Sequence, residues 1–334
     1  MKAQALVCDA GQRFSLSGVN LPDPGPDHIV VDTLYSGVSI GTEFALVQGK
    51  ISWGPYPICT GYQGVGVVLE TGRDVVGFSP GDRVYYRDNR EMSLSDGTPL
   101  SSASGVHCSK ALIHVPSTHG VALLPEGVDE EAASLFVMPA VGLNGVDQAN
   151  PRLGESVVVY GCGLVGLGVV AACSHRGCVV TAIDLRDDPL AVARTLGADH
   201  TANVSSPDFH DTVRQIVPDG ADVVFESTGI PACIDPAIEL CRKRGHFVLQ
   251  GNYGQEPISY HFLPPHGKQL TWHYPCDDGL APSRTAVLKN MASDALPWRH
   301  VITHRVTSAE APEFYADINA GDLPDVIGAV VRWQ

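Results

Sequence analysis

The sequence predicts an α/β protein of two domains, in which a parallel β-sheet covered by helices accompanies a smaller domain of short β-strands. From residue 152 to about residue 251, apolar strands alternate with helices, which is typical of a parallel sheet with helices on its faces. Residues 1 to about 125 carry short alternating apolar runs separated by glycine and proline, as in a small barrel or sandwich. A glycine-rich turn opens the first helix of the alternating part.

The expected strands of the smaller domain follow in order along the chain. Apolar runs occupy residues 29–34 and 64–70, and another follows a proline turn over residues 81–85. The end of the chain is irregular until a final apolar run at residues 329–333, so the tail could return to the first domain. We therefore predict a first domain at 1–125, a central domain at 126–268 and a return segment at 269–334.

The central domain opens with a predicted dinucleotide-binding unit. An apolar strand at residues 157–160 runs into the glycine-rich residues 161–166, and a helix follows. A second strand at residues 179–183 then stops at Asp184. The order strand, GxGxxG, helix, strand and acid is that of a βαβ unit that binds NAD-type cofactors. The alternative is an ordinary glycine-rich turn of a parallel-sheet protein.

Each part of the glycine-rich turn has a physical reason to bind a dinucleotide. Gly161 permits the tight turn, Gly163 lets the backbone approach a pyrophosphate, and Gly166 lets the helix pack closely on the strand. The helix begins with Leu164 and Val165, whose N–H groups and positive dipole end suit phosphates.

The acid at the end of the second strand favours NAD over NADP. Asp184 can accept both ribose hydroxyls and would repel a 2′-phosphate. Leu185 and Arg186 follow, and Arg186 could contact a phosphate, so NADP stays an alternative. Ligands of open parallel sheets bind beyond the carboxyl ends of the strands. Unless these are ordinary turns, the nicotinamide half is expected near Ser227, Thr228, Gly229, Gly251 and Asn252.

The composition is that of a compact folded protein. The chain has 334 residues, of which 44% are hydrophobic and 18% charged, enough for two domains with a core each. Lysine and arginine total 22 against 37 aspartate and glutamate, a formal net charge of −15. That balance argues against nucleic acid and anionic membranes as partners and leaves a small-molecule substrate.

Targeting and membrane-spanning segments are not expected. Residues 1–7 read as an opening strand, too short and too polar at Gln4 for a signal peptide. No apolar window approaches the roughly 18 residues that a membrane span needs. The nine cysteines include no CxxC pair, so we expect reduced, mostly buried thiols in a cytoplasmic protein.

Taken in order, these motifs resemble the medium-chain dehydrogenase/reductase superfamily over essentially the whole chain. The matching landmarks are residues 61–66, 81–84, 152–155, 161–166, 220–224 and 302–306. The resemblance implies a GroES-like barrel built from both chain ends, a central Rossmann domain and an active site in the cleft between them. It also implies a homodimer joined through the edges of the Rossmann sheets.

The positions that hold catalytic zinc in relatives carry other residues here. Ser39 stands where a cysteine is expected, and Tyr62 and Gln63 replace the histidine and glutamate of a Gly-His-Glu triplet. The third ligand position falls near Ala140, and the four-cysteine structural zinc lobe is missing. Zinc needs thiolate, imidazole or carboxylate ligands, so we expect no metal.

The turn at residues 36–43, together with residues 140–146, is similar to the zinc-lacking subgroup around the bacteriochlorophyllide a dehydrogenases. That subgroup oxidises a secondary 1-hydroxyethyl group with NAD. The resemblance implies hydride transfer between NAD and a secondary alcohol on a sugar, cyclitol or other cyclic or polyhydroxylated substrate. The alternatives are an NAD(P)H-dependent enoyl or quinone reductase and a catalytically inactive dinucleotide-binding protein.

Without zinc, hydrogen bonds or a general base must handle the alcohol proton. Tyr62 is the first candidate, to hold the oxygen or to donate to it, and otherwise a wall of the site. Thr42 matches the relay hydroxyl of zinc relatives, and Ser39 lies beside it. Glu43 is either a base or, as the matching acid in relatives usually is, structural.

Other residues are assigned to the site by the resemblance alone. Asn144 matches a threonine beside the nicotinamide, or else it is a helix-start or turn asparagine. The expected lining of the substrate pocket, or alternatively core, is Trp53, Tyr56, Gln63, Trp272 and Tyr274. Three polar residues have no motif support, namely His107, His266 and Lys268.

Overall fold

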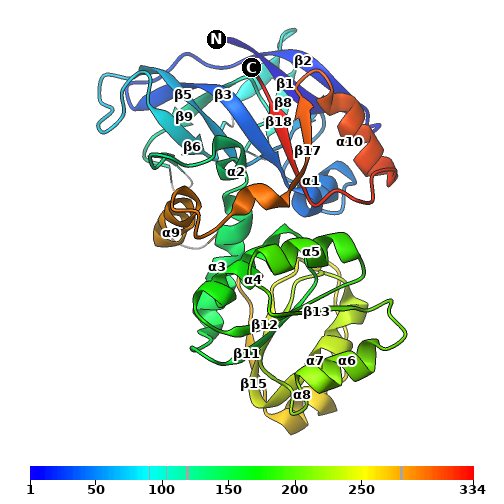
Figure 1. Cartoon of the computed structure of the whole chain (residues 1–334). Helices are drawn as coiled ribbons and strands as arrows, with labels where there is room; N and C mark the ends of the chain where they lie inside the picture. Colours follow the sequence, from blue (N-terminus) through cyan, green and yellow to red (C-terminus); the bar gives the residue numbers. More distant parts are fainter. Residues whose placement is uncertain (90, 103, 118–119, 279–280) are drawn as a thin grey trace. The chain divides into compact units, whose positions relative to one another are not determined.

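The computed structural model describes residues 1–89, 91–102, 104–117, 120–278 and 281–334 (Figure 1). The chain forms two compact units, one of Met1–Leu135 with Ile302–Gln334 and one of Phe136–Val301. The boundaries expected at residues 125 and 268 therefore lie at 135 and 301 instead.

The first unit contains a small closed β-barrel. Its strands are antiparallel neighbours except for one parallel pair, β4 (Ile58–Cys59) with β8 (Pro99–Ser102). The order around the barrel is β1 (Lys2–Cys8), β2 (Phe14–Asn20), β7 (Met92–Leu94), β8 (Pro99–Ser102) and β4 (Ile58–Cys59). Alternate apolar residues of β1, Ala5 and Val7, point into its core with Leu100.

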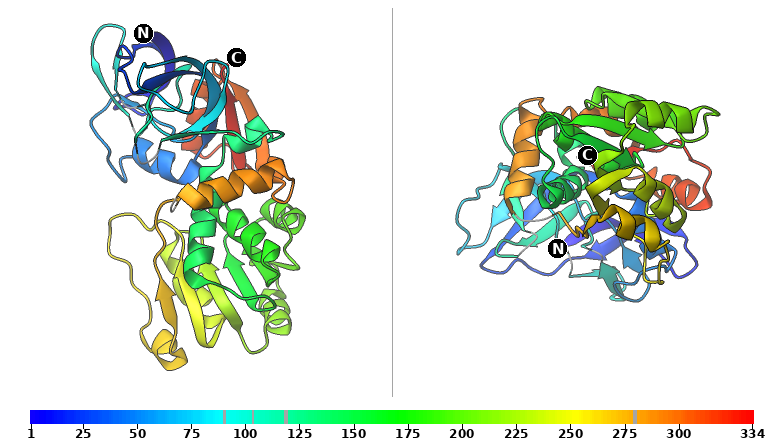
Figure 2. Two further views of the ribbon diagram at one scale, coloured as in Figure 1. Left: turned by 90° about the vertical axis from the view of Figure 1, so that its left-hand side faces the viewer. Right: turned by 90° about the horizontal axis from the view of Figure 1, so that it is seen from below.

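A larger sheet completes the first unit. Its order is β10 (Val121–Leu123), β6 (Arg83–Tyr86), β5 (Gly64–Thr71), β3 (His28–Val38), β18 (Gly328–Arg332) and β17 (Ile302–Thr307), and β9 (Lys110–His114) also pairs with β3. Strand β18 runs antiparallel to β3 and places Val331 opposite Ser36. The tail thus returns to the first unit, and Figure 2 shows these red and orange strands among the blue and cyan ones. The helices of this unit are α1 (Ile40–Val47), α2 (Glu130–Ala133) and α10 (Ala311–Ala320).

The second unit is a parallel sheet with the order β13 (His200–Asn203), β12 (Val179–Asp184), β11 (Ser156–Tyr160), β14 (Ala221–Glu226), β15 (Cys241–Leu249) and β16 (Thr271–His273). Numbered along the chain, this is 3-2-1-4-5-6, the doubly wound Rossmann order. The predicted α/β fold, a central Rossmann domain with a GroES-like β-barrel domain, is therefore confirmed. Strand β11 is central, and its run of three valines is fully buried because helices cover both faces of such a sheet.

The helices of the second unit are α3 (Val137–Ala149), α4 (Leu164–His175), α5 (Asp187–Thr195), α6 (Phe209–Ile216), α7 (Ile234–Glu239), α8 (Leu263–Lys268) and α9 (Ala281–Ala292), with 3-10 turns η1 (Pro231–Cys233) and η2 (Trp298–Val301). These helices connect the parallel strands or, in the case of α3 and α9, precede and follow them in the chain. Within the described residues, no helix is long and apolar enough to cross a membrane.

The two boundary differences have structural causes. Residues 271–273 form β16, which extends the parallel sheet, and α9 packs on α3, so this segment belongs to the second unit. Helix α2 packs on β3 and β5, which keeps residues 126–135 in the first unit. Seven of the nine cysteines are buried, as expected, and none forms a disulfide.

Candidate active site and dinucleotide site

The turn after β3 brings Ser39 and Tyr62 together. The Tyr62 phenol donates a hydrogen bond to Ser39 Oγ. Both side chains are buried, with 4% and 6% of their surfaces exposed. The neighbouring Gly37 N–H donates to the Gln63 carbonyl at 3.1 Å, which aligns the two segments. The two positions expected to replace zinc ligands are therefore joined directly by a hydrogen bond.

The surroundings of Tyr62 set the protonation of its phenol. Burial raises the pKa of Tyr62 to about 12, although its hydrogen bonds with Ser39 and Thr42 act in the opposite direction. The Arg87 guanidinium lies 5.4 Å from the centre of the ring, and Arg87 Nε donates to the Tyr62 carbonyl at 3.2 Å. Near neutral pH the phenol is thus protonated, so it can hold or protonate an oxygen but is not a resting base.

Glu43 lies in the first turn of α1 and is 1% exposed. Its Oε1 accepts the Ser39 N–H at 2.7 Å, and its Oε2 accepts the Tyr315 hydroxyl at 2.9 Å. His107 Nε2 lies 2.9 Å from the same Oε2. Burial opposes ionisation, but His107 and these hydrogen bonds lower the pKa of Glu43 below its usual value. A carboxylate so occupied favours the structural interpretation of Glu43 over that of a base.

His107, which belongs to no recognisable motif, is fully buried at the centre of a cluster with Ser36, Glu43, Tyr315 and Trp333. Its Nδ1 lies 2.7 Å from Ser36 Oγ, which also accepts the Trp333 indole N–H at 2.8 Å. The partners of the His107 side chain, Ser36, Glu43 and Tyr315, are 64 to 208 residues away in the sequence. No local pattern around residue 107 could therefore have revealed the cluster.

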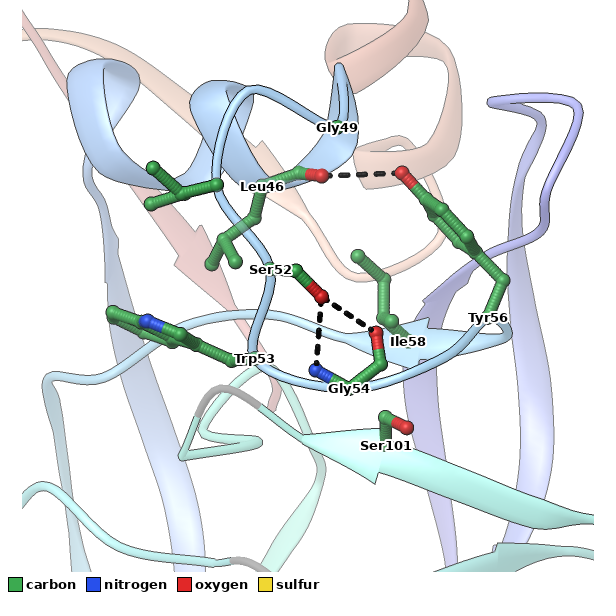
Figure 3. Close-up of a pocket in the computed structure, with 9 residues that line it drawn as sticks. Leu46, Gly49, Ser52, Trp53, Gly54, Tyr56, Ile58 and Ser101 are labelled. Carbon is green, nitrogen blue, oxygen red and sulfur yellow. Dashed lines mark hydrogen bonds between the residues drawn. The ribbon is translucent and has the colours of Figure 1, made fainter. Parts of the chain in front are cut away.

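Trp53 and Tyr56 line a pocket in the first unit (Figure 3). The Tyr56 hydroxyl donates to the carbonyls of Leu46 and Val47 at 3.1 and 2.8 Å, which fixes the ring against the end of α1. The Trp53 side chain is 52% exposed at the rim. The structure thus brings these two predicted lining residues together. Gln63, also predicted to line the pocket, is fully buried and is not among its lining residues.

The donor set around Ser39 and Tyr62 does not fit a zinc ion. Both positions offer neutral hydroxyls that are hydrogen-bonded to each other, whereas zinc takes thiolate, imidazole or carboxylate ligands. Among the residues that the structure describes, no three histidine, cysteine or acidic side chains gather closely enough to hold a metal ion.

The predicted dinucleotide turn joins β11 to α4 in the second unit. Gly161 has a φ of +98°, and a Cβ on Gly166 would lie 1.9 Å from the Gly161 carbonyl oxygen, so both positions require glycine. Gly163 caps the helix, and a Cβ there would meet nothing within 4 Å. Leu164 and Val165 form the first turn of α4, which has no side-chain cap. This open, uncapped helix start fits a pyrophosphate.

Asp184 ends β12 beside the turn, as predicted. Its carboxylate accepts the Cys162 N–H at 2.7 Å and the Arg186 N–H at 3.0 Å, one on each oxygen. Each oxygen keeps a lone pair that can accept a ribose hydroxyl. Leu185 follows with 65% of its surface exposed.

The turns after β14 and β15 adjoin the glycine-rich turn. A Cβ on Gly161 would lie 2.9 Å from the Thr228 nitrogen, and one on Gly251 would lie 2.3 Å from the Gly229 nitrogen. A Cβ on Gly229 would lie 2.6 Å from the Asn252 oxygen. The predicted residues therefore gather at the carboxyl ends of the strands, where open parallel sheets bind ligands.

Ser227 supports a polar ligand at this place. Its Oγ is buried and has no hydrogen-bond partner in the described part of the chain. Its Cβ would lie 3.3 Å from a Cβ on Gly166, next to the start of α4. An unpartnered buried hydroxyl is costly unless a ligand or water satisfies it.

Sequence reasoning missed Glu226, the last residue of β14, which is fully buried. Its carboxylate accepts the Thr228 and Gly229 N–H groups at 3.0 and 3.4 Å and the hydroxyls of Thr228 and Tyr253. Burial raises the pKa of Glu226 above its usual value. An acid directly after the apolar residues 223–225 was the available signal. Through its hydrogen bond with Tyr253, the Glu226 carboxylate connects the turn after β14 to the turn after β15.

Two residues assigned by resemblance have other contacts in the second unit. Asn144 lies in the middle of α3, so the helix-start interpretation was wrong, and its amide donates to the Cys276 and Asp277 carbonyls at 2.9 and 3.3 Å. Trp272 packs on Phe247 with ring centres 4.8 Å apart. Trp272 thus extends the sheet core at its edge, and it belongs to a different unit from Trp53 and Tyr56.

The remaining candidates have simple surroundings. Lys268 donates to the Ile238, Glu239 and Cys241 carbonyls at 2.7 to 3.1 Å and so caps the end of α7. His266 is exposed and stacks on Phe262. Tyr274 is 65% exposed.

Two family models and several full-length relatives match the chain. The alcohol dehydrogenase GroES-like domain matches residues 25–125, and the zinc-binding dehydrogenase family matches residues 165–274. A 2-desacetyl-2-hydroxyethyl bacteriochlorophyllide A dehydrogenase from Rhodobacter capsulatus is 28% identical over all of this chain and 99% of its own. An erythritol/L-threitol dehydrogenase from Mycolicibacterium smegmatis is 26% identical over 92% of each chain.

A solved structure shares the fold. It is that of a protein assigned as a zinc-binding dehydrogenase from Sinorhizobium meliloti 1021 and bound to NADP. It aligns over the whole of both chains with a TM-score of 0.85 and 21% identity. The chain thus carries two domains that occur together in medium-chain dehydrogenase/reductases, an alcohol dehydrogenase GroES-like domain and a zinc-binding dehydrogenase domain, and it shares their fold.

Proposed function

We propose that this chain is an NAD-dependent oxidoreductase that transfers hydride between a secondary alcohol and nicotinamide without zinc. The observation that carries the proposal is the hydrogen bond between Tyr62 and Ser39, the two residues that the resemblance assigns to zinc-ligand positions. The glycine-rich turn and Asp184 supply the dinucleotide site. The relatives support alcohol chemistry, because one is named for a hydroxyethyl bacteriochlorophyllide and another for erythritol and L-threitol.

A bound nicotinamide supplies the hydride acceptor or donor, and the residues of the first unit handle the proton. In the oxidative direction the Tyr62 oxygen accepts the proton of the substrate hydroxyl while Tyr62 passes its own proton to Ser39 Oγ or to the Thr42 hydroxyl. In the same step that hydroxyl gives up its own proton, so no protonated hydroxyl is formed, and water can take this proton at the half-buried Thr42. Because the pKa of Tyr62 is about 12, these transfers are coupled and no free phenolate is formed. In the reductive direction Tyr62 donates to the carbonyl oxygen.

The preference for NAD rests on Asp184. Its carboxylate keeps acceptor positions that suit ribose hydroxyls and repel a 2′-phosphate. The NADP bound to the structural relative makes the other cofactor the competing outcome. Values of kcat/KM for NAD and NADP with one substrate decide between them, and a preference for NADP would refute this part of the proposal.

The pocket of Trp53 favours a substrate with a ring. Its lining is mainly apolar, from Leu46, Ile51, Trp53 and Ile58, with Ser52 and Ser101 as hydroxyl groups (Figure 3). A half-exposed indole suits the apolar face of a sugar, a cyclitol or a planar ring system. The proposed substrate is therefore a cyclic or polyhydroxylated secondary alcohol.

We also propose a cytoplasmic homodimer. The edge strand β16 pairs with β15 on one side and ends the sheet on the other. Near it lie apolar side chains that are 41% to 75% exposed, namely Tyr260, Phe262, Leu263 and Tyr274. A second copy that pairs at this edge would cover them. The free thiols of all nine cysteines support a reducing compartment.

A substrate panel tests the proposed function. NAD with secondary alcohols, polyols and cyclitols should give reduced cofactor, whereas NADPH with enones and quinones should give no turnover. Turnover in the second assay alone would assign a reductase of activated double bonds. Tight binding of NADH without turnover in either assay would assign an inactive dinucleotide-binding protein.

A further inference from the structure

We infer that His107 is a positioning residue. It holds the turn that carries Ser39 (residues 36–43) against the segment that carries Tyr62 (residues 60–62). A metal ion would hold the two segments together in the same way if each of them supplied a ligand. The inference rests on the proposed function and deepens it. His107 touches neither Tyr62 nor the Ser39 side chain through any bond described above, so it acts through other residues.

The backbone of His107 is hydrogen-bonded to the segment that leads to Tyr62. The His107 N–H donates to the Thr60 carbonyl at 3.1 Å, and the Val106 N–H donates to the Gly61 carbonyl at 3.0 Å. Residues 106–107 and 60–61 therefore run side by side. Tyr62 follows directly in the chain, so its position depends on this pairing.

The side chain of His107 contacts the other segment, which is the turn that carries Ser39. Its Nδ1 lies 2.7 Å from Ser36 Oγ, and its Nε2 lies 2.9 Å from Glu43 Oε2. These two partners flank Ser39 in the chain. Glu43 in turn accepts the Ser39 N–H at 2.7 Å. One imidazole ring thus crosslinks the segment of Tyr62 to both ends of the turn that carries Ser39.

Both ring nitrogens of His107 lie within hydrogen-bond distance of buried oxygen atoms. Trp333 Nε1–H donates to Ser36 Oγ, so the hydroxyl hydrogen of Ser36 is available for His107 Nδ1. Nε2 lies 2.9 Å from Glu43 Oε2 and 2.6 Å from the Tyr315 hydroxyl, so both ring nitrogens have buried partners. Tyr315 donates to the same carboxylate oxygen at 2.9 Å. A ring held on both nitrogens cannot rotate without breaking two buried bonds.

The series Ser36, His107 and Glu43 has the order of a hydrolytic triad, but it cannot act as one. Each of the three residues is at most 1% exposed, so no substrate can reach Ser36 Oγ. Ser36 Oγ is also already engaged by Trp333. Because the three residues are buried, their role is structural, and it is to hold the turn that carries Ser39 in position.

The absence of a side chain at Gly61 leaves space for the His107 ring. Its φ is +87°, and a Cβ on it would lie 2.7 Å from His107 Cδ2 and 2.8 Å from the His107 backbone nitrogen. Any side chain at residue 61 would push the ring away from Ser36 and Glu43. The glycine directly before Tyr62 is thus required by His107.

Replacement of His107 in the full chain tests the inference. His107→Leu should lower kcat on the order of 10²-fold, because a misplacement of about 1 Å at the reacting groups costs that much. The dissociation constant of NADH should stay within about twofold, since its site lies in the other unit. His107→Gln, which keeps a nitrogen donor for Glu43, should restore most of the lost kcat.

Asn89→Leu is the matched control. Asn89 is 1% exposed and ties the same segment by donating to the Gly105 and Lys110 carbonyls at 3.1 and 2.9 Å. Its loss should lower the melting temperature about as much as His107→Leu does, yet leave kcat within about threefold. Equal losses of kcat in the two variants would overturn the inference.

Hydrogen exchange separates the inference from the proposed function. The Ser39 amide, which donates to Glu43, should exchange faster in His107→Leu than in Asn89→Leu, whether or not the protein turns over an alcohol. Absence of turnover in the wild-type protein would refute the proposed function alone. Unchanged exchange of residues 36–43 in His107→Leu would refute the positioning role alone.

Discussion

At the residue scale, the proposed chemistry depends on the hydroxyl of Tyr62. Its phenol contacts Ser39 and Thr42, and burial raises its pKa to about 12. Ser39 and Thr42 are expected from the sequence because they occupy a recognisable turn. The raised pKa is not, because it arises from burial, which a sequence motif does not measure.

Tyr62→Phe removes the hydroxyl and keeps the ring. We expect kcat to fall at least about 10²-fold, the usual contribution of a positioned proton donor or acceptor, with NADH affinity unchanged. Steady-state kinetics and a fluorescence titration of NADH measure the two effects. Tyr86→Phe is the control, because Tyr86 is also buried and its hydroxyl lies 2.7 Å from the Thr33 hydroxyl. A near-normal kcat in Tyr62→Phe would make Tyr62 a wall of the site.

Glu226 predicts a pH dependence of stability in the second unit. Burial raises its pKa above the usual 4.5, so between these two values the folded state binds more protons than the unfolded state. The free energy of unfolding should therefore fall as pH rises through that window, and Glu226→Gln should remove this part of the fall. Urea titrations of both proteins at a series of pH values measure it. Parallel profiles for the two proteins would contradict the assignment.

At the element scale, the turn between β11 and α4 was predictable in detail. The glycines of the turn, the strand before it and Asp184 lie close together in the sequence, so they form a pattern that can be recognised locally. Strand β16 was not predicted, since three residues, Thr271–His273, are too few to show a periodicity. The cluster around His107 was missed for a different reason, because its members come from distant elements.

Gly166→Ala tests the packing of this turn. The new Cβ would lie 1.9 Å from the Gly161 carbonyl oxygen, so α4 must move away from β11. We expect a loss of about 2 kcal/mol or more in unfolding free energy and at least a tenfold weaker NADH affinity. Calorimetry and NADH titration report both. Gly163→Ala, where a Cβ meets nothing within 4 Å, should keep normal stability and so separates fold from binding.

At the scale of the whole molecule, both units and the return of the tail followed from the sequence and its resemblance. The boundary at residue 301 did not, because it depends on packing of α9 on α3 and on β16 at a sheet edge. The cysteine pattern was informative at this scale as well, since seven of the nine thiols are buried.

Metal content is the prediction that belongs to the whole chain. Elemental analysis of the purified protein should find less than about 0.1 zinc per chain, and turnover should survive dialysis against a chelator, because the donors present are hydroxyls. A matched zinc-containing alcohol dehydrogenase should lose activity under the same dialysis. One tightly bound zinc ion per chain, needed for turnover, would refute the proposed mechanism.

Because the first unit is interrupted by the second, its assembly is tied to the order of synthesis. Strand β3 lies between β5 and β18, and β18 is made only after all of Phe136–Val301. Strand β9 already pairs with His28–Asp32 on that side of β3, but while a ribosome is still extending the chain, Tyr35–Val38 therefore have no neighbour there. The second unit can finish folding earlier than the first. Such an unpaired side is where nascent copies would adhere to one another. Yield in a cell should thus depend on how quickly the final strands emerge.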